Sequence, residues 1–252
     1  MKPNSSLAET PATAQKSYSK PGPKASYRII PARPEHAQGV HDVVCLANDF
    51  PLGTAGCIGF DGFDVLIKRF PEGQFVAVTN VDGSEKVIGL AIVMRTDYLP
   101  SAPPKSWRDM IGDYGLKNHA PDGRWLYGVE KAVHPDFQGV GIGSALYKAQ
   151  FDLVKRLELD GMYAGGMLKG YKHFKQMSVR EYAGKVMRGE IFDPTVSVQM
   201  RKGFEARTLI ENYSWDHESE HAGMLIVWET PHETQKEVQK KVEAQIQPPR
   251  VA

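Results

Sequence analysis

The most informative stretch of the chain is Val133-His134-Pro135-Asp136-Phe137-Gln138-Gly139-Val140-Gly141-Ile142-Gly143-Ser144. An apolar segment, Trp125 to Val133, runs into it and predicts a strand, and an amphipathic segment, Gly141 to Leu159, leaves it and predicts a helix. Three glycines stand at alternate positions where this helix begins, so the backbone can approach a ligand closely. The first amides of a helix lack internal acceptors, and the helix dipole favours negative charge there. The stretch therefore predicts a phosphate-binding turn between a strand and a helix.

Two familiar phosphate-binding patterns do not match this turn. The dinucleotide pattern G-x-G-x-x-G meets Ser144 at its last position, although an acidic residue, Glu158 or Asp160, follows at the expected distance. The pattern G-x-x-x-x-G-K-[ST] requires a lysine that the turn lacks. A glycine-rich turn that binds no ligand is the simplest alternative.

The pattern that does match is Q/R-x-x-G-x-G/A, from Gln138 to Gly143, which resembles the acyl-CoA pyrophosphate loop of the GNAT superfamily of N-acetyltransferases. The preceding Ala132-Val133-His134-Pro135 is similar to the end of that family's fourth strand. Three later stretches resemble the acetyltransferase modules that some bacteria carry fused to carbon–nitrogen hydrolases. These stretches are Gly165-Gly166-Met167-Leu168-Lys169-Gly170-Tyr171, Met177-Ser178-Val179-Arg180-Glu181-Tyr182 and Gly189-Glu190-Ile191-Phe192-Asp193-Pro194-Thr195-Val196-Ser197.

The order of sequence signals indicates one domain over residues 26–230, between polar tails at 1–25 and 231–252. Strand patterns occupy residues 27–30, 74–80, 86–98, 125–133, 161–167, 204–213 and 222–229. Helix patterns occupy residues 34–48, 62–70, 141–159, 178–191 and 194–202, with a short helix at 107–111 inside the loop-like segment 99–124. This order predicts an α/β (α+β) fold rather than a doubly wound nucleotide fold. It matches the GNAT order, which implies a mixed, mostly antiparallel sheet, flanked by helices and splayed at strands 4 and 5.

Bulk properties narrow the class of protein. The net charge of +1 gives no reason to expect nucleic acid or an anionic membrane as partner. The two cysteines, Cys45 and Cys57, make neither a disulfide framework nor a metal quartet, so no metal is expected. No apolar run is long enough for a membrane span, and no secretory signal pattern opens the chain. We therefore expect a cytoplasmic protein, for which a homodimer remains open.

The resemblance implies the co-substrate acetyl-CoA and transfer of its acetyl group to a primary amine by direct attack in a ternary complex. The acceptor is a small-molecule amine or an exposed amino group. Val133 is implied as the strand-end residue whose backbone amide polarises the thioester, and Gln138 as a side chain that structures the turn. Lys148 or Arg156 offers charge to the nucleotide phosphates, or simply belongs to a solvated helix face. The residues implied to bind acetyl-CoA are Val133, Gln138, Gly139, Val140, Gly141, Ile142, Gly143 and Ser144.

The chemistry requires a base, because an alkyl amine stays protonated near pH 7. Glu130 is the candidate, since a carboxylate within a central strand is unusual unless it is functional or paired. Pairing with a nearby lysine or arginine is the equally weighted alternative. The general acid stays unassigned, because the usual tyrosine of the family is replaced by Gln199, four residues before Gly203. Candidates to replace it are Tyr127, Tyr163, Tyr171 or solvent.

Two further functions remain open. A non-catalytic acyl-CoA-binding or regulatory module that partners a separate hydrolase is favoured by the missing tyrosine, and a nucleotide-binding oxidoreductase is disfavoured by Ser144 and by the strand order. Residues 99–124 and the acidic turn, residues 214–220, are expected to shape the acceptor pocket. The carboxylates of that turn suggest a cationic acceptor, or else a solvated loop.

Overall fold

The computed structural model describes residues 26–54, 57–58 and 62–231. Within them a seven-stranded sheet has the order β1-β2-β3-β4-β5-β7-β6. The strands are β1 (Arg28–Pro31), β2 (Gln74–Val81), β3 (Ser84–Thr96), β4 (Trp125–Val133), β5 (Gly161–Met167), β6 (Glu205–Ile210) and β7 (Gly223–Glu229). Strands β4 and β5 pair in parallel, and the other neighbours pair antiparallel, which confirms the predicted mixed sheet. The predicted tails, apart from residue 231, lie outside the described residues.

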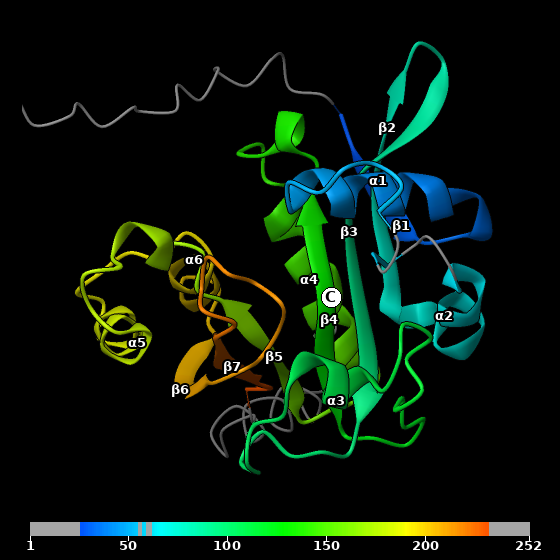
Figure 1. Cartoon of the computed structure of the whole chain (residues 1–252). Helices are drawn as coiled ribbons and strands as arrows, with labels where there is room; N and C mark the ends of the chain where they lie inside the picture. The colour runs from blue at the N-terminus through cyan, green and yellow to red at the C-terminus, as the bar shows by residue number, and fades with distance from the viewer. Residues whose placement is uncertain (1–25, 55–56, 59–61, 232–252) are drawn as a thin grey trace, which may run out of the picture.

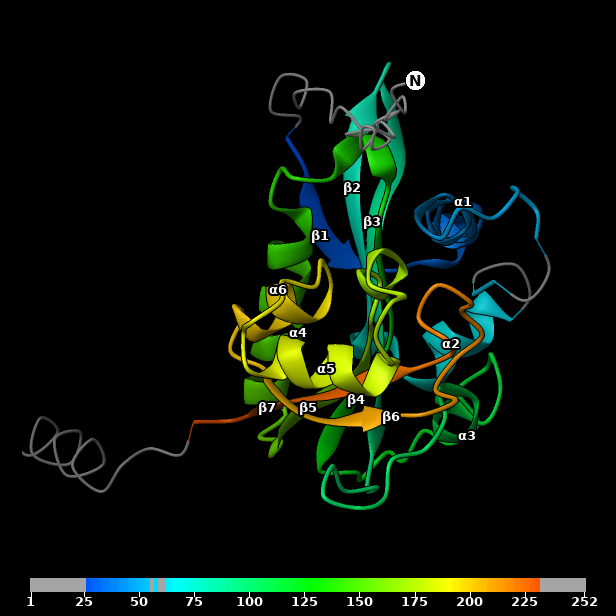
Figure 2. The same ribbon diagram turned by 60° about the vertical axis from the view of Figure 1, so that its left-hand side comes forward.

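Helices cover both faces of the sheet (Figures 1 and 2). One face carries α4 (Ile142–Arg156), α5 (Val179–Met187) and α6 (Val196–Met200), and the other carries α1 (Ala37–Ala47), α2 (Phe63–Arg69) and α3 (Trp107–Ile111). Short 3-10 helices lie at η1 (Pro34–His36), η2 (Pro71–Gly73), η3 (Pro135–Phe137) and η4 (Tyr171–His173). None of the described helices is long and apolar enough to cross a bilayer.

Burial on both faces explains the apolar sequence of the central strand. Residues 87–94 of β3 are all buried, because α1 packs on one face of this strand and α4 on the other. A strand that is covered on both sides loses the alternation of apolar and polar residues. On α4, the predicted apolar stripe faces the sheet, and Ile142, Leu146 and Leu153 are buried in it.

Three elements are shorter than their sequence patterns predict, two at their ends and one at its start. Helix α5 ends at Met187 because Gly189 adopts a φ of 74°, which a helix cannot continue. Strand β6 ends at Ile210 because Asn212 has a φ of 52°. Helix α6 starts at Val196, later than predicted. The Asp193 carboxylate accepts hydrogen bonds from the amides of Thr195 and Val196, and so holds the preceding residues in a turn outside the helix. Ser178 caps the start of α5, since its Oγ accepts a hydrogen bond from the Glu181 amide at 3.1 Å.

The sheet opens between its two parallel strands. Pairing of β4 with β5 runs from Trp125 to Gly128 on one strand and from Gly161 to Ala164 on the other, and the strands diverge beyond these residues. This divergence, called the fork below, confirms the expected splay. A β-bulge lies beside it, because Ile92 pairs with Glu130 and Val93 with Gly128, which leaves Val129 out of the ladder with β3.

Candidate active site

The loop from Gln138 to Ser144, called the amide loop below, joins the end of β4 to α4. Gly139 and Gly141 have φ angles of 78° and 96°, a left-handed conformation that other residues adopt at a cost. No described residue accepts a hydrogen bond from the amides of residues 139–143. These amides and the positive end of the 15-residue helix α4 fit an anionic phosphate. Gly139 is exposed, and a Cβ placed on it would meet nothing within 4 Å, so the surface of the loop is open at this residue.

The side chains in and beside the amide loop stabilise its conformation and contribute no positive charge to it. Gln138 Nε2 donates to the carbonyl of Val133 at 3.2 Å, which accords with the turn-structuring role expected of Gln138. The Ile142 side chain is buried in the core, so it is not available to a ligand. Lys148 Nζ forms an ion pair with Asp152 Oδ2 at 2.5 Å, on the exposed side of α4. The solvated-face interpretation of Lys148 is therefore the one that the structure supports.

Glu130 lies two residues past the fork on β4 and is partly buried. No described lysine or arginine forms a salt bridge with it, and its own hydrogen bond is from the Lys131 amide to Oε1 at 3.1 Å. The paired alternative for Glu130 is therefore not what the structure forms. Burial raises the pKa of its carboxyl group, against the opposing effects of that amide and of the charges on Lys169 and Lys131. A carboxyl group with a raised pKa is suited to accept a proton near neutral pH.

Lys131, the next residue in β4, was not predicted as a site residue. Its Nζ lies 4.0 Å from the centroid of the Tyr147 ring on α4, and 3.9 Å from where a Cβ on Gly143 would be. Burial lowers the pKa of its ammonium group to about 8. The signal available in the sequence was a lysine within an otherwise apolar central strand, where an unpaired charge is rare.

Gln199, at the position where the resemblance implies a tyrosine, is buried and contacts Tyr147. Its Nε2 donates to the Tyr147 hydroxyl oxygen at 3.1 Å, while its Oε1 has no hydrogen-bond partner among the described residues. A Cβ on Gly166 would lie 2.4 Å from that Oε1, so this glycine is needed to make room for Gln199. Gln199, Tyr147 and Lys131 form a continuous row across the α4 side of the sheet.

The three tyrosines proposed as replacement acids have fixed partners. The Tyr163 hydroxyl donates to the Tyr98 carbonyl at 2.6 Å, and the Tyr171 hydroxyl donates to the Met177 carbonyl at 2.9 Å. The Tyr127 hydroxyl oxygen lies 2.9 Å from that of Tyr213, and burial raises the pKa of Tyr127 well above its ordinary value. Because their hydrogen bonds are already made inside the fold, none of them is the best source of a proton.

A small recess opens on the other face of the sheet at the fork. It encloses about 290 Å³ of empty space, part of it open to solvent. Its walls combine four tyrosines with apolar residues of the segment 99–124, including the stretch before α3. The lining residues are Tyr98, Leu99, Pro100, Ala102, Pro104, Lys105, Met110, Tyr127, Tyr163, Ala164, Gly165, Ile210, Tyr213 and Leu225. We call this space the tyrosine recess.

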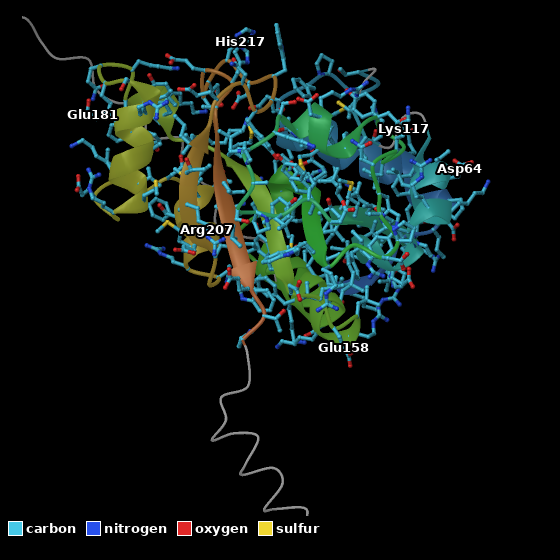
Figure 3. All side chains as sticks on the ribbon, turned by 90° about the horizontal axis from the view of Figure 1, so that it is seen from below. Asp64, Lys117, Glu158, Glu181, Arg207 and His217 are labelled. Atoms are coloured by element: carbon cyan, nitrogen blue, oxygen red, sulfur yellow. The ribbon has the colours of Figure 1, made fainter. Side chains whose placement is uncertain are left out.

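The carboxylates of the acidic turn point to lysines rather than into a pocket. Lys169, Lys172 and Lys175 form ion pairs with Asp216, Glu218 and Glu220, at 3.4, 3.0 and 3.5 Å. Figure 3 shows His217 of this turn at the periphery of the molecule, where the other labelled residues also lie. The hint of a cationic acceptor loses its basis, because these negative charges are already balanced.

The two cysteines are buried on the face that carries α1. Burial, followed by the neighbouring Cys45 thiol, raises the pKa of the Cys57 thiol to about 12. A thiol with so high a pKa is a poor nucleophile at neutral pH. Among the described residues, no group of three or more His, Cys, Asp or Glu side chains is arranged to hold a metal ion.

Comparison with known proteins extends this description, although no protein-family model matches the chain. The probable hydrolase YhcX of Bacillus subtilis (strain 168) is 35% identical over 148 residues, which are 58% of this chain and 28% of YhcX. The chain thus matches little more than a quarter of that protein. The uncharacterized N-acetyltransferase YkwB of the same bacterium is 31% identical over 163 residues, which are 64% of this chain and 70% of YkwB.

Solved structures share the fold at low sequence identity. The loading GNATL domain of CurA from Lyngbya majuscula has a TM-score of 0.67 at 16% identity, over 81% of this chain and 98% of that one. The GphF GNAT-like decarboxylase in complex with isobutyryl-CoA has a TM-score of 0.63 at 17% identity, over 80% and 98%. These likenesses define the class as the GNAT fold. Together with the match to YkwB, they show that the chain belongs to the GNAT superfamily of N-acetyltransferases.

Proposed function

We propose that the protein is an N-acetyltransferase that moves an acetyl group from acetyl-CoA to a primary amine by direct attack in a ternary complex. The observation that carries this proposal is the Glu130 carboxyl group, which is partly buried, unpaired among the described residues and two residues from the fork. An amine near pH 7 must lose a proton before it attacks a thioester. Glu130 supplies the base, and its raised pKa brings it closer to the working pH.

The amide loop holds the co-substrate in this proposal. Backbone amides of Gly139 to Gly143 bind the pyrophosphate, whereas the Ser144 amide already donates to the Gly141 carbonyl at 3.1 Å. Gln138 keeps the loop in place through its bond to Val133. Val133 lies five residues past Gly128, roughly 16 Å along the strand, so its backbone lines the path of the pantetheine arm. The bulge residue Val129 lies beside the fork and outside the ladder, and is better placed to polarise a carbonyl there.

The tyrosine recess receives the acceptor. It lies on the face of the sheet opposite to α4, the face that Glu130 shares with Tyr213. Its walls are mainly apolar and aromatic, so it suits an amine with an apolar body better than a polyamine. A small-molecule amine or an exposed amino group with an apolar neighbour satisfies this description.

Thermal shift and thiol release test the proposal together. Acetyl-CoA should raise the melting temperature and NAD should not, since the amide loop departs from the dinucleotide pattern. Free thiol should then appear when acetyl-CoA is supplied with a panel of primary amines. Glu130→Gln should lower the rate by about 10²-fold to 10⁴-fold at pH 7, and Glu72→Gln, at an exposed position of η2, should not. Stabilisation by NAD alone, or an unchanged rate in Glu130→Gln, would contradict the proposal.

A second candidate is a non-catalytic acyl-CoA-binding or regulatory module that partners a hydrolase. Two observations favour it, namely Gln199 at the tyrosine position and the similarity to part of the probable hydrolase YhcX. The same assay separates the two candidates. A module of this kind would be stabilised by acetyl-CoA yet release no thiol with any amine.

A further inference from the structure

Acetyl transfer releases a thiolate that needs a proton, and Gln199 cannot supply it. We propose that Lys131 is the catalytic acid of this protein, and that its ammonium group delivers the proton to the sulfur. This inference rests on the proposed function and adds to it the group that sequence reasoning left unassigned. The Lys131 ammonium lies over the Tyr147 ring, whose hydroxyl is held by Gln199.

The position of Lys131 suits this role because it lies between the amide loop and the fork. It is three residues past Gly128 on β4, and its Nζ is 3.9 Å from the Cβ position of Gly143 at the start of α4. A ligand held by the loop and reaching the fork must therefore pass this ammonium group. The Tyr147 ring forms a cation–π contact with the Lys131 ammonium group, which stabilises the cation without neutralising its charge.

The charges around Lys131 leave its proton available. Glu130, its neighbour in the strand, favours the charged form, and Lys202, which follows α6, disfavours it. From α4 it meets the neutral Tyr147 ring, and no described carboxylate forms a salt bridge with it. The resulting pKa of about 8 is close to the ordinary value of a thiol, about 8.5. Transfer of a proton from such an ammonium to a thiolate is nearly balanced in free energy.

The other proton donors nearby are less suitable. The Tyr147 hydroxyl is held in place by Gln199, and burial raises its pKa far above that of a thiol. Tyr127 and Tyr213 bond each other on the opposite face of the sheet. Lys131 is therefore the donor that lies on the α4 face of the sheet and has a pKa close to that of a thiol.

The step balances as follows. The amine nitrogen forms its bond to the acetyl carbon, the carbon–sulfur bond breaks, and its electron pair stays on sulfur. The amine arrives as an ammonium ion and gives its first proton to Glu130, which passes it to water before the attack. After the nitrogen–carbon bond forms, the nitrogen gives a second proton to Glu130. The Lys131 ammonium gives its proton to sulfur, which leaves CoA as a thiol and Lys131 as a neutral amine. Water then returns a proton to Lys131 and removes one from Glu130.

Three variants of the full chain test the assignment. Lys131→Met removes the charge and the proton, whereas Lys131→Arg keeps the charge but holds its proton too tightly to donate it. Lys155→Met removes an exposed lysine from the last turn of α4 and serves as the control. The measurements are kcat and KM for acetyl-CoA against pH, and the thiolate absorbance of bound CoA against pH.

We expect kcat to fall about 10²-fold in both Lys131 variants, with KM for acetyl-CoA changed less than 3-fold. The fall of wild-type kcat above pH 8 should vanish in Lys131→Met. Bound CoA should form its thiolate at lower pH in the wild type and Lys131→Arg than in Lys131→Met. A raised KM with unchanged kcat would instead make Lys131 a phosphate ligand, and an unchanged kcat in either variant would overturn the assignment. A wild type that binds acetyl-CoA but releases no thiol overturns the proposed function itself, and the acid with it.

Discussion

Glu130 and Lys131 are adjacent in β4, yet their side chains lie on opposite faces of the sheet. The Glu130 carboxyl group is close enough to Cys57 and Tyr213 to affect their ionisation, whereas the Lys131 ammonium lies over Tyr147 on α4. Alternation along a strand places one residue of any such pair on each side. At a fork between two strands, a single dipeptide can therefore face both substrates, one from each side.

The raised pKa of Glu130 predicts a pH-dependent gain of stability in Glu130→Gln. A carboxyl group whose pKa is higher in the folded state binds more protons there than in the unfolded chain. Its ionisation therefore lowers the free energy of unfolding as pH rises from the unfolded value of 4.5 through the raised folded value. Glu130→Gln should be more stable than the wild type in urea at pH 8, and the difference should disappear below pH 4.5.

Glu72→Gln is the control for this experiment, since Glu72 is exposed and forms no ion pair among the described residues. It should show no such difference at pH 8. Equal stability of Glu130→Gln and wild type at both pH values would show that Glu130 is not desolvated.

The glycines of the amide loop predict that the effects of a substitution on folding stability and on acetyl-CoA affinity can be separated. Gly141→Ala and Gly189→Ala both place a Cβ on a residue with positive φ, 96° and 74°, and neither Cβ would meet an atom closer than 3.4 Å. Each should lower the free energy of unfolding by about 1–2 kcal/mol. Only Gly141→Ala should also lower the affinity for acetyl-CoA, by about 10-fold in calorimetric titration. The loop would relax to relieve the backbone strain, and its amides would then no longer point at the pyrophosphate. Equal affinity in the two variants would remove the amide loop from the binding site.

Local chemistry explains what was predictable from the sequence. The bounds of β4 and β5 and of the short helix α3 match the predicted ranges, because apolar runs and capping residues fix them within a few neighbours. The hairpin at Asp82 and Gly83 was predictable for the same reason, since both residues adopt positive φ. The conformation of the amide loop was predictable too, because it depends on glycines within the loop itself.

Contacts between distant segments account for what was missed. Lys131, Tyr147 and Gln199 belong to three elements, and only the fold brings them into one row. The charge balance of the acidic turn was missed in the same way, because its partner Lys172 lies 46 residues before Glu218. Period and motif report which face a residue takes, but not which remote side chain it meets there.

A buried carboxylate anchors the region that follows β5, and its loss should be costly. Asp193 is fully buried, and its Oδ2 accepts from the Gly170 amide at 2.9 Å and the Tyr182 hydroxyl at 3.0 Å. Its Oδ1 accepts from the amides of Thr195 and Val196 at 2.8 and 2.9 Å. Asp193→Asn replaces one acceptor oxygen by a donor, so two buried donors lose their partner. We expect a loss of about 3 kcal/mol in urea denaturation.

Asp152→Asn is the matched surface change, because Asp152 pairs with Lys148 on the exposed side of α4. It should cost less than about 1 kcal/mol. A similar small loss in Asp193→Asn would mean that the four contacts are not formed together in solution.

The shape of the tyrosine recess depends on one ring held between two glycines. A Cβ on Gly165 would lie 2.1 Å from Tyr213 Cζ, and one on Gly223 would lie 2.6 Å from Cδ1 of the same ring. Gly165→Ala must therefore displace Tyr213, which breaks the 2.9 Å contact with the Tyr127 hydroxyl and alters the recess. We expect a loss of about 1–3 kcal/mol in stability and a raised KM for the amine, with KM for acetyl-CoA unchanged. Tyr213→Leu removes the clashing ring, so the double variant should lose less stability than the sum of the two single variants. Additive losses would show that Gly165 and Tyr213 are not in contact, and a raised KM for acetyl-CoA would place the recess on the co-substrate side of the fork.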